Sequence, residues 1–423
     1  MKSGRLGVLA WLMAGSQACI ADPEAARLPD VIQLSGSVRA GYWSSSRDLD
    51  QDANLTNGAT RIKATSEPLD NYRLYAEGYV SRQDLFSSRT NNTKNVLREG
   101  YLDTTRGTID LKLGKQIIAW GRADRFNPTD NLTPRDFTLL AVEDDDQRIG
   151  TPSIKADYRL GTLSITPVWL WDFQGNTVPI GQLAPGVSLL RVPVEGKYRQ
   201  GAFKIDQTGK AIDWSVSYYA GFDLNPDVSP ALVSPTAVAV ALSNHRIKVI
   251  GFDAATTVGR LGLRAETAYT KTEDSDGRDP FIKNSNLYTV LGAERLFRET
   301  LAVNLQYLSR VVMNFHRVDE IPDASLRALA STEATISNQT HRYNHGIALR
   351  VSERWLYQTL ETEAAYVYTF GQHDHVLRLK VRYAISDRWE AALGSDLFRG
   401  SPDTFYGRLR DNSTYFAQLK VSF

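Results

Sequence analysis

Hydrophobic and polar residues alternate along most of this 423-residue chain, in short segments that continue to the last residue. In the segment 376–385, for example, Leu377 and Leu379 fall on one face, and Arg378 and Lys380 fall on the other. In an extended backbone, successive side chains point to opposite sides. The period of two therefore predicts β-strands that each have one apolar and one polar face.

The pattern predicts an all-β fold with about 18 strands, within a range of 16–18, that close into an antiparallel barrel. An even number of strands returns both ends of the chain to the same side of the barrel. The expected strands cover residues 31–46, 59–67, 72–84, 95–105, 108–119, 151–160, 163–173, 201–209, 212–224, 245–257, 262–273, 286–297, 300–314, 342–352, 356–370, 375–385, 389–398 and 414–423.

The connections between these segments favour a transmembrane barrel over a soluble β-sandwich, whose strands would also alternate. Tight turns, as at 105–107, 160–162 and 386–388, separate longer polar loops, and outer-membrane barrels have this asymmetry. The chain holds 19 Tyr, 15 Phe and 8 Trp, many of them near the strand ends, as expected of aromatic girdles. After the first twenty residues no apolar run approaches the roughly 20 residues that a membrane helix needs.

The last residues continue the alternation and end on an aromatic side chain. Tyr415, Ala417, Leu419, Val421 and Phe423 share one face of the final expected strand. This ending resembles the C-terminal signature that outer-membrane barrels present to the barrel-assembly machinery, which the resemblance implies as a partner. Together with the alternation, it places the chain in the outer membrane of a Gram-negative bacterium.

The N-terminus has the layout of a secretory signal peptide. Lys2 and Arg5 form a basic region, 6–14 is apolar, and small residues lead to an expected cleavage after Ala21. We therefore expect a signal peptide at 1–21 and a barrel at 22–423. Lipidation of Cys19 is the less favoured alternative. Because Cys19 is the only cysteine, the mature chain has no disulfide and no thiolate chemistry.

Net charge and motifs argue against several functional classes. Lys plus Arg is 49 and Asp plus Glu is 48, so bulk charge does not favour a nucleic-acid partner. The chain contains no Gly-x-Ser-x-Gly elbow, phosphate-binding loop or His-Glu-x-x-His helix. We therefore expect no enzymatic activity and no cofactor.

Two short stretches hold residues of types that bind metals. His373 and His375 fall in an expected loop with His345 as a possible neighbour, but only two ligands are evident and a site needs three or four. The spacing in the stretch 48–52 opens a calcium loop, yet the required glycine and the closing glutamate are missing. An ordinary polar loop is favoured at the first stretch, and a looser calcium contact remains open at the second.

Residues 111–136 read LKLGKQIIAWGRADRFNPTDNLTPRD, and REGYLDTTRGTIDL precedes them. This stretch resembles outer-membrane barrels related to the alginate-export family, in which a Gly-Lys-Gln strand ends in Trp-Gly and an Asn-Pro-x-Asp loop follows. The resemblance covers about fifty residues. It implies transport of solutes or polymers across the outer membrane, without indicating a particular cargo.

The connection that follows the fifth expected strand, about residues 120–150, is unusually long for a plain loop. As the third outer loop, it is expected to fold inward and narrow the pore, with arginines and acidic residues that face each other and filter solutes. The alternative is a solvated loop with local ion pairs. The residues assigned to this constriction are Arg122, Arg125, Arg135, Glu143, Asp144, Asp145, Asp146 and Arg148.

The polar faces of the expected strands carry further charges that we assign to the lumen. Oppositely charged residues on adjacent strands form cross-strand ladders that stiffen a wide barrel. Because most of these positions are basic, the sequence indicates a mild preference for anionic solutes. The assigned residues are Arg246, Lys248, Arg350, Arg378, Lys380, Arg382, Glu361 and Glu363.

Three outer segments are unusual for a simple diffusion channel. Residues 174–200 and 226–244 mix apolar residues with Pro, Gly and Ser, and 323–336 can form a helix that starts at Asp323. Such segments can cover the mouth, plug it or contact another protein. Exposed apolar loops fit a hydrophobic or polymeric cargo better than a small polar one.

The leading hypothesis is a passive outer-membrane channel, a porin or an export pore, that lies among outer-membrane lipids and lipopolysaccharide. A second hypothesis is the outer-membrane partner of an inner-membrane exporter for lipids or other hydrophobic compounds, which predicts a plugged lumen. An outer-membrane enzyme is a third hypothesis, but the nucleophile and base that it needs are not evident in the sequence.

Overall fold

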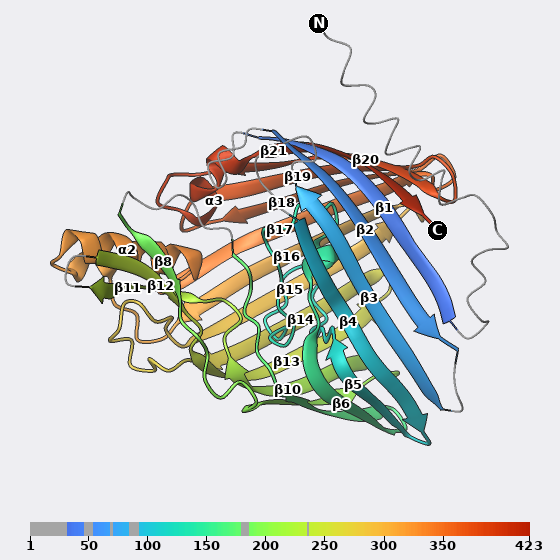
Figure 1. Cartoon of the computed structure of the whole chain (residues 1–423), viewed down its shortest axis with the longest axis horizontal. Coiled ribbons are helices and arrows are strands. Elements are labelled where there is room, and N and C mark those ends of the chain that lie inside the picture. Colours follow the sequence, from blue (N-terminus) through green and yellow to red (C-terminus); the bar gives the residue numbers. More distant parts are fainter. Residues whose placement is uncertain (1–31, 46–53, 68–70, 84–92, 179–185, 235–236) are drawn as a thin grey trace, which may run out of the picture.

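The computed structural model describes residues 32–45, 54–67, 71–83, 93–178, 186–234 and 237–423. In this part of the chain, one closed antiparallel sheet of 18 strands forms a barrel (Figure 1). Its strands are β1 (Ile32–Ser45), β2 (Asn54–Ser66), β3 (Tyr72–Gln83), β4 (Thr93–Arg106), β5 (Ile109–Gln116), β6 (Thr151–Leu160), β7 (Leu163–Leu170), β9 (Gln200–Gln207), β10 (Ile212–Phe222), β13 (Arg246–Val258), β14 (Leu261–Lys271), β15 (Asn286–Phe297), β16 (Leu301–Val312), β17 (Tyr343–Trp355), β18 (Leu360–Thr369), β19 (Asp374–Ala384), β20 (Trp389–Arg399) and β21 (Thr414–Ser422).

Each barrel strand pairs with the next barrel strand along the chain, and β21 pairs with β1 to close the sheet. At this seam the backbone N–H of Gly36 donates to the carbonyl of Phe423 at 2.9 Å, and the N–H of Phe423 donates to the carbonyl of Gly36 at 3.0 Å. Closure leaves no free sheet edge, so every strand satisfies its backbone within the barrel.

Tight turns and long connections lie at opposite ends of the barrel. Turns such as 107–108, 161–162 and 259–260 lie at the end where β1 begins and β21 ends. The connections 117–150 and 313–342 begin and end at the other end, and 313–342 with its helix lies on the left in Figure 1. This asymmetry is typical of outer-membrane barrels, in which the long loops are extracellular.

The two faces of the sheet differ as the alternation requires. Outward-facing Leu379 and Leu393 are 41% and 58% exposed, whereas inward-facing Ser215 and Glu266 are completely buried. Large apolar side chains thus cover the outside, and polar groups are packed inside. Among the described residues, no helix combines the length and the apolar character needed to cross a bilayer.

A small second sheet lies beyond the barrel at the end with the long loops (Figure 1). It contains β8 (Ser188–Arg191), β11 (Asp227–Ser234) and β12 (Ala237–Ser243), and β12 pairs antiparallel with β11 and parallel with β8. Helix α2 (Ala324–Ile336) packs against β11, and Asp323 caps its N-terminus by accepting from Leu326 N. The short segments η1 (Asp144–Gln147), η2 (Val318–Glu320), α3 (Phe405–Arg408) and η3 (Arg410–Asn412) complete the elements.

All eighteen expected strands are confirmed, and each overlaps one strand of the barrel. The helix that starts after Asp323 is also confirmed. The sequence did not indicate β8, β11 and β12, because their residues lie in apolar loop stretches that lack a clear period of two. The expected signal peptide at 1–21 and the calcium contact at 48–52 lie outside the described residues.

Candidate channel constriction

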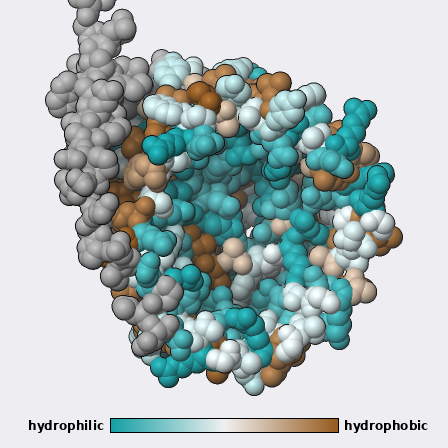
Figure 2. Space-filling model, turned by 90° about the vertical axis from the view of Figure 1, so that its right-hand side faces the viewer, coloured by the Kyte–Doolittle hydropathy of each residue, from teal (hydrophilic) through white to brown (hydrophobic). Residues whose placement is uncertain are grey.

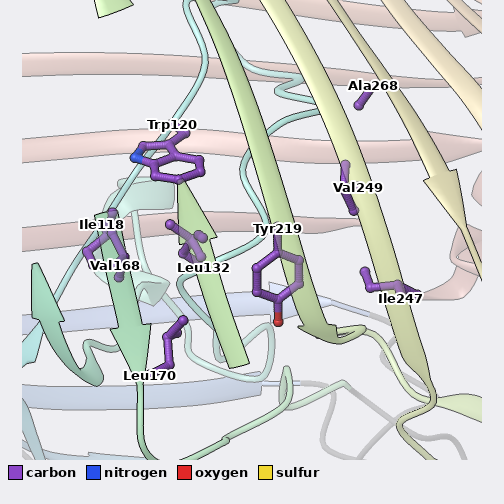
Figure 3. Close-up of a cluster of buried hydrophobic side chains, with 10 residues drawn as sticks. Ile118, Trp120, Leu132, Val168, Leu170, Tyr219, Ile247, Val249 and Ala268 are labelled. Carbon is purple, nitrogen blue, oxygen red and sulfur yellow. The ribbon is translucent and has the colours of Figure 1, made fainter. Parts of the chain in front are cut away.

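The connection 117–150 between β5 and β6 enters the barrel and packs against its inner wall. Ile118, Trp120 and Leu132 from this connection form an apolar cluster with inward side chains of β7, β9, β10, β13 and β14. Figure 3 shows Trp120 and Leu132 beside the wall residues Val168 and Tyr219. Burying one side chain of this size contributes about 1.5–3 kcal/mol, so the cluster ties the loop to the wall.

A single carboxylate on β14 holds the middle of the same loop. Glu266 Oε1 accepts from the backbone N and from Oγ1 of Thr129, both at 2.8 Å. Its Oε2 accepts from the backbone N atoms of Arg122 and Ala123, both at 3.0 Å. Four donors converge on one fully buried carboxylate, so this part of the loop has a defined position relative to the wall.

Arg122 extends this attachment to two further strands. Its guanidinium forms ion pairs with Asp206 on β9, at 2.9 Å, and with Asp253 on β13. Asp253 also accepts from the hydroxyl of Ser215 on β10. The charge of Arg122 is therefore used to fasten the loop to the wall.

The acidic segment 143–146 reaches the opposite side of the barrel. Asp146 pairs with Arg39 on β1 and, at 2.7 Å, with Arg61 on β2. Glu143 pairs with Lys380 at 3.1 Å and with Arg382 at 2.9 Å, both on β19. The segment thus lies between two groups of lumen cations on strands that are far apart in the sequence.

Asp144 joins the loop to the wall through two arginines. Its carboxylate pairs with Arg378 of β19 at 2.9 Å and with Arg125 of the loop at 2.7 Å. Burial alone would raise the pKa of Asp144, but Arg378 and Arg125 hold it well below its usual range. Arg39 and Arg61 lower the pKa of Asp146 in the same way against the effect of burial. Both carboxylates are therefore charged at neutral pH.

The remaining loop arginines pair within the loop. Arg148 pairs with Asp130 at 2.6 Å and with Asp145 at 3.3 Å, and Arg135 lies 3.9 Å from Asp130. Arg98 of β4 donates to the backbone carbonyls of Arg148 and Asp145 at 2.9 and 2.6 Å. These contacts position the last part of the loop, which leads into β6. They leave the Asp145 side chain 84% exposed.

Two more apolar clusters complete the contacts of the loop with the wall. Leu140 and Val142 pack with Trp43 and Phe416 near the seam, and Phe126 packs against the inner faces of β17, β18 and β19. The loop therefore touches the wall on several sides, and any passage through the barrel runs between the loop and the wall. Figure 2 looks into the end with the tight turns, where mainly hydrophilic residues surround the central hollow.

Six of the eight residues assigned to the lumen wall face inward. Glu361 lies 2.8 Å from Arg382, and Glu363 lies 2.7 Å from Arg350 and 3.8 Å from Lys380. Arg350 also approaches Asp124 of the loop at 3.3 Å, and Arg378 pairs with Asp396 at 2.6 Å. These groups form a ladder of alternating charge on β17–β20 that faces the acidic segment of the loop.

The other two residues require a correction, because Arg246 and Lys248 lie on the outward face of β13. They alternate with the buried Ile247 and Val249 and share their face with the exposed Ile250. Both strand faces carry apolar residues here, because the inner face packs against the loop. The rule that charged residues face the lumen therefore failed on this strand.

Several wall residues that bind the loop were missing from the expected site, among them Glu266, Asp253, Arg39 and Arg61. Glu266 and Asp253 were not singled out because their role depends on the path of a loop that is remote in the sequence. Arg39 and Arg61 lie on β1 and β2, where alternation places them on the polar face. That alternation was the only available signal for the two arginines.

The residues of the expected assembly signal lie at the seam. Tyr415 and Phe423 are 61% and 59% exposed on the outward face of β21 and just beyond it. Leu419 and Val421 share this face and stand opposite Ala40 and Val38 of β1.

Neither a protein-family model nor a curated protein sequence matches this chain. Among solved structures, OccK5 (OpdH) of Pseudomonas aeruginosa matches with a TM-score of 0.55 and 12% identity over 93% of this chain and 98% of its own. OccK11 (OpdR) of the same organism matches with a TM-score of 0.53 and 11% identity over 93% and 96%. The chain shares the fold of these two proteins. The relation to the alginate-export barrels stays a prediction.

Proposed function

We propose that this protein is a passive channel in the outer membrane of a Gram-negative bacterium, with the loop 117–150 as its constriction. The observation that carries this proposal is the loop itself. It enters a closed 18-stranded barrel and is fastened to wall strands on several sides by buried hydrogen bonds, ion pairs and apolar contacts. A barrel of this size encloses an aqueous lumen, and a loop that folds inward narrows this lumen.

The outer surface of the barrel supports a membrane location. Exposed Leu, Ile and Val side chains cover the middle of the strands, and exposed aromatic residues such as Trp355 and Tyr383 lie near the strand ends. A closed sheet with this surface matches the requirements of a bilayer, in which backbone groups find no water and aromatic rings prefer the interface.

The charges that line the lumen favour small or polymeric anionic solutes. Arg378, Lys380 and Arg382 lie on one side of the lumen, next to the acidic loop segment 143–146, and Arg350 on the same side approaches Asp124 of the loop. Glu143 and Asp144 are partly exposed, so a carboxylate or phosphate on a solute can compete with them for these cations. A cation would find the neighbouring wall carboxylates already paired with arginine and lysine.

Single-channel recording of the refolded mature chain in a planar bilayer tests this proposal. We expect stable conductance steps with a reversal potential that indicates anion preference. Arg378→Gln removes a lumen cation and should shift the reversal potential toward cations. Lys248→Gln is the matched control, because it removes one positive charge from the outer face of the barrel and should leave both conductance and selectivity unchanged.

The wide contact between the loop and the wall favours a second candidate, an outer-membrane exporter component with a plugged lumen. Such a barrel would fold, as shown by a heat-dependent shift on gels, and would insert without producing conductance steps. That result would contradict the passive channel. Conductance steps with a preference for cations would contradict only the proposal that the solutes are anionic.

A further inference from the structure

The outer rim of β16–β20, at the end with the long loops, carries an unusual group of histidines. Three of the six histidines of the chain, His345, His373 and His375, lie here. Only the four-residue connection 370–373 joins β18 to β19 at this point. In the register between β19 and β20, His375 stands opposite Arg399. The side chains of His345, His373 and Arg399 are exposed, and that of His375 is partly exposed.

Tyrosine hydroxyls bind two of these imidazoles in the same way. The hydroxyl of Tyr368 lies 2.9 Å from Nδ1 of His373, and the hydroxyl of Tyr307 lies 3.4 Å from Nδ1 of His345. When a tyrosine O–H donates to Nδ1, the neutral ring carries its proton on Nε2. Each imidazole then presents an N–H donor on the side that faces away from the tyrosine.

Aromatic rings surround the histidines. His345 packs against Phe370 with ring centroids 5.1 Å apart, and His375 packs against Tyr366 at 5.5 Å. Tyr368 contacts Phe370 at 5.5 Å, in an edge-to-face arrangement. Rings of this kind combine an apolar body with a polar tip, which suits the boundary between lipid tails and head groups.

The height of this group matches the membrane interface. On β17, the ten residue steps from His345 to Trp355 rise about 33 Å along the strand. A strand tilt of about 40° reduces this distance to about 25 Å, which is the height of the apolar band of such barrels. Trp355 and Tyr383 mark the lower edge of this band, so the histidines stand at the level of the head groups in the other leaflet.

Arg399 brings a positive charge to this rim. Arg399 donates to the carbonyl of Phe398 at 2.8 Å and reaches Ser413 Oγ at 3.5 Å, and in the described part of the chain it forms no ion pair. The nearby Asp374 points inward, where its carboxylate accepts from Tyr406 N at 2.7 Å. The outer rim therefore offers a guanidinium and imidazole N–H donors, and in the described part of the chain no carboxylate forms an ion pair with Arg399.

We propose that His345, His373, His375 and Arg399 bind the phosphate group of an outer-leaflet lipid on the outside of the barrel. Arginine and N–H donors match the oxygens of a phosphate, and the flanking rings contact the upper part of the acyl chains. The proposal rests on the membrane location of the proposed function. It adds a lipid-binding site that is separate from the lumen.

Native mass spectrometry of the purified barrel in detergent tests this site, with diphosphoryl lipid A as the probe. We expect the wild-type protein to retain lipid A and to bind the enzymatically dephosphorylated lipid more weakly. The double variant His375→Ala/Arg399→Ala should weaken binding by about tenfold, equivalent to about 1.4 kcal/mol. Tyr368→Phe keeps the ring but removes the hydroxyl at His373, and it should cause a smaller loss.

Controls separate this proposal from its alternatives. Lys248→Ala removes an outward charge from β13 and should retain lipid like the wild type, and the heat-dependent gel shift confirms that every variant folds. Unchanged binding by the double variant, or equal binding of the dephosphorylated lipid, would overturn the proposal. Displacement of the lipid by excess inorganic phosphate would instead show that these residues bind free phosphate. If the variants conduct normally but still bind lipid A, the proposed lipid site is refuted, while the proposed channel function is still supported.

Discussion

Glu266 on β14 and Thr129 in the loop 117–150 are joined by two hydrogen bonds of 2.8 Å, although 137 positions separate them in the sequence. The same carboxylate also accepts from the backbone of Arg122 and Ala123. One side chain of the wall thus holds two turns of the constriction loop.

Replacement of this carboxylate should loosen the constriction. In Glu266→Gln, an amide NH₂ group faces two N–H donors, and each buried donor left without an acceptor costs about 1–3 kcal/mol. We expect single-channel recordings to show larger and noisier conductance, with the barrel still folded. Glu294→Gln is the control, because Glu294 is partly exposed in the lumen, pairs with Arg264 and does not contact the loop. Equal conductance in both variants would show that the loop does not limit the current.

Closure of the barrel depends on the absence of a side chain at position 36. A Cβ atom on Gly36 would lie 2.4 Å from the carbonyl oxygen of Arg61 and 2.7 Å from the ring of Phe423. We expect Gly36→Val to destabilise the β1–β21 seam by about 1–3 kcal/mol or more. The folded fraction in a heat-dependent gel shift and its melting temperature measure this effect. Ala40→Val is the control on the same outward face, and similar losses in both would indicate a general effect of added volume.

The constriction should persist in mild acid. The pKa of the Asp144 carboxyl is depressed in the folded protein, so its ion pairs contribute stability above the unfolded pKa, which is lost as the pH falls through the folded value. We therefore expect conductance and selectivity to change little between pH 7 and about pH 4, near the ordinary pKa of an aspartate. Asp144→Asn should loosen the constriction loop already at neutral pH, because Arg125 and Arg378 lose a charged partner. An acid transition of the wild type near pH 4–5 would contradict this assignment.

The sequence predicted the barrel well because the apolar and polar faces of a membrane strand are set residue by residue. The alternation of Leu377, Arg378 and Leu379, for instance, places each side chain without any knowledge of its neighbours. The constriction was less accessible, because Glu266 and Asp253 acquire their roles only when a remote loop folds against them. Lys248 shows the same limit: the loop covers the inner face of β13 with apolar contacts, so the local pattern no longer distinguishes lumen from lipid.

A buried carboxyl outside the barrel should make the long loops sensitive to pH. Glu333 of α2 is 2% exposed and accepts from Val228 N at 2.6 Å and from Ser337 Oγ at 2.5 Å. Burial raises its pKa to about 7, with Lys283 opposing this effect and Asp227 adding to it. Lys283 in turn pairs with Asp227 at 2.7 Å, so the helix, β11 and the connection 272–285 share one charged network.

The raised pKa of Glu333 determines whether the long loops gain or lose stability as the pH rises. Between the ordinary pKa of a glutamate and about pH 7, the folded loops hold a proton that the unfolded chain has released, so their stability falls as the pH rises through this window. His245 acts in the same direction, because its hydrogen bond to Asp227 raises its pKa and the resulting stability is lost as the imidazole deprotonates.

Glu333→Gln should therefore protect the long loops at pH 8 and change little at pH 5. The amide can still accept from Val228 N and can donate to Ser337 Oγ, and it has no charge to desolvate. A tenfold change in proton affinity corresponds to about 1.4 kcal/mol, so we expect a gain of a few kcal/mol at most. Limited proteolysis within 313–342 at the two pH values measures this gain. Glu320→Gln, at an exposed position of the same connection, should leave the cleavage rate unchanged, and a loop that resists cleavage equally in both variants would refute the role of Glu333.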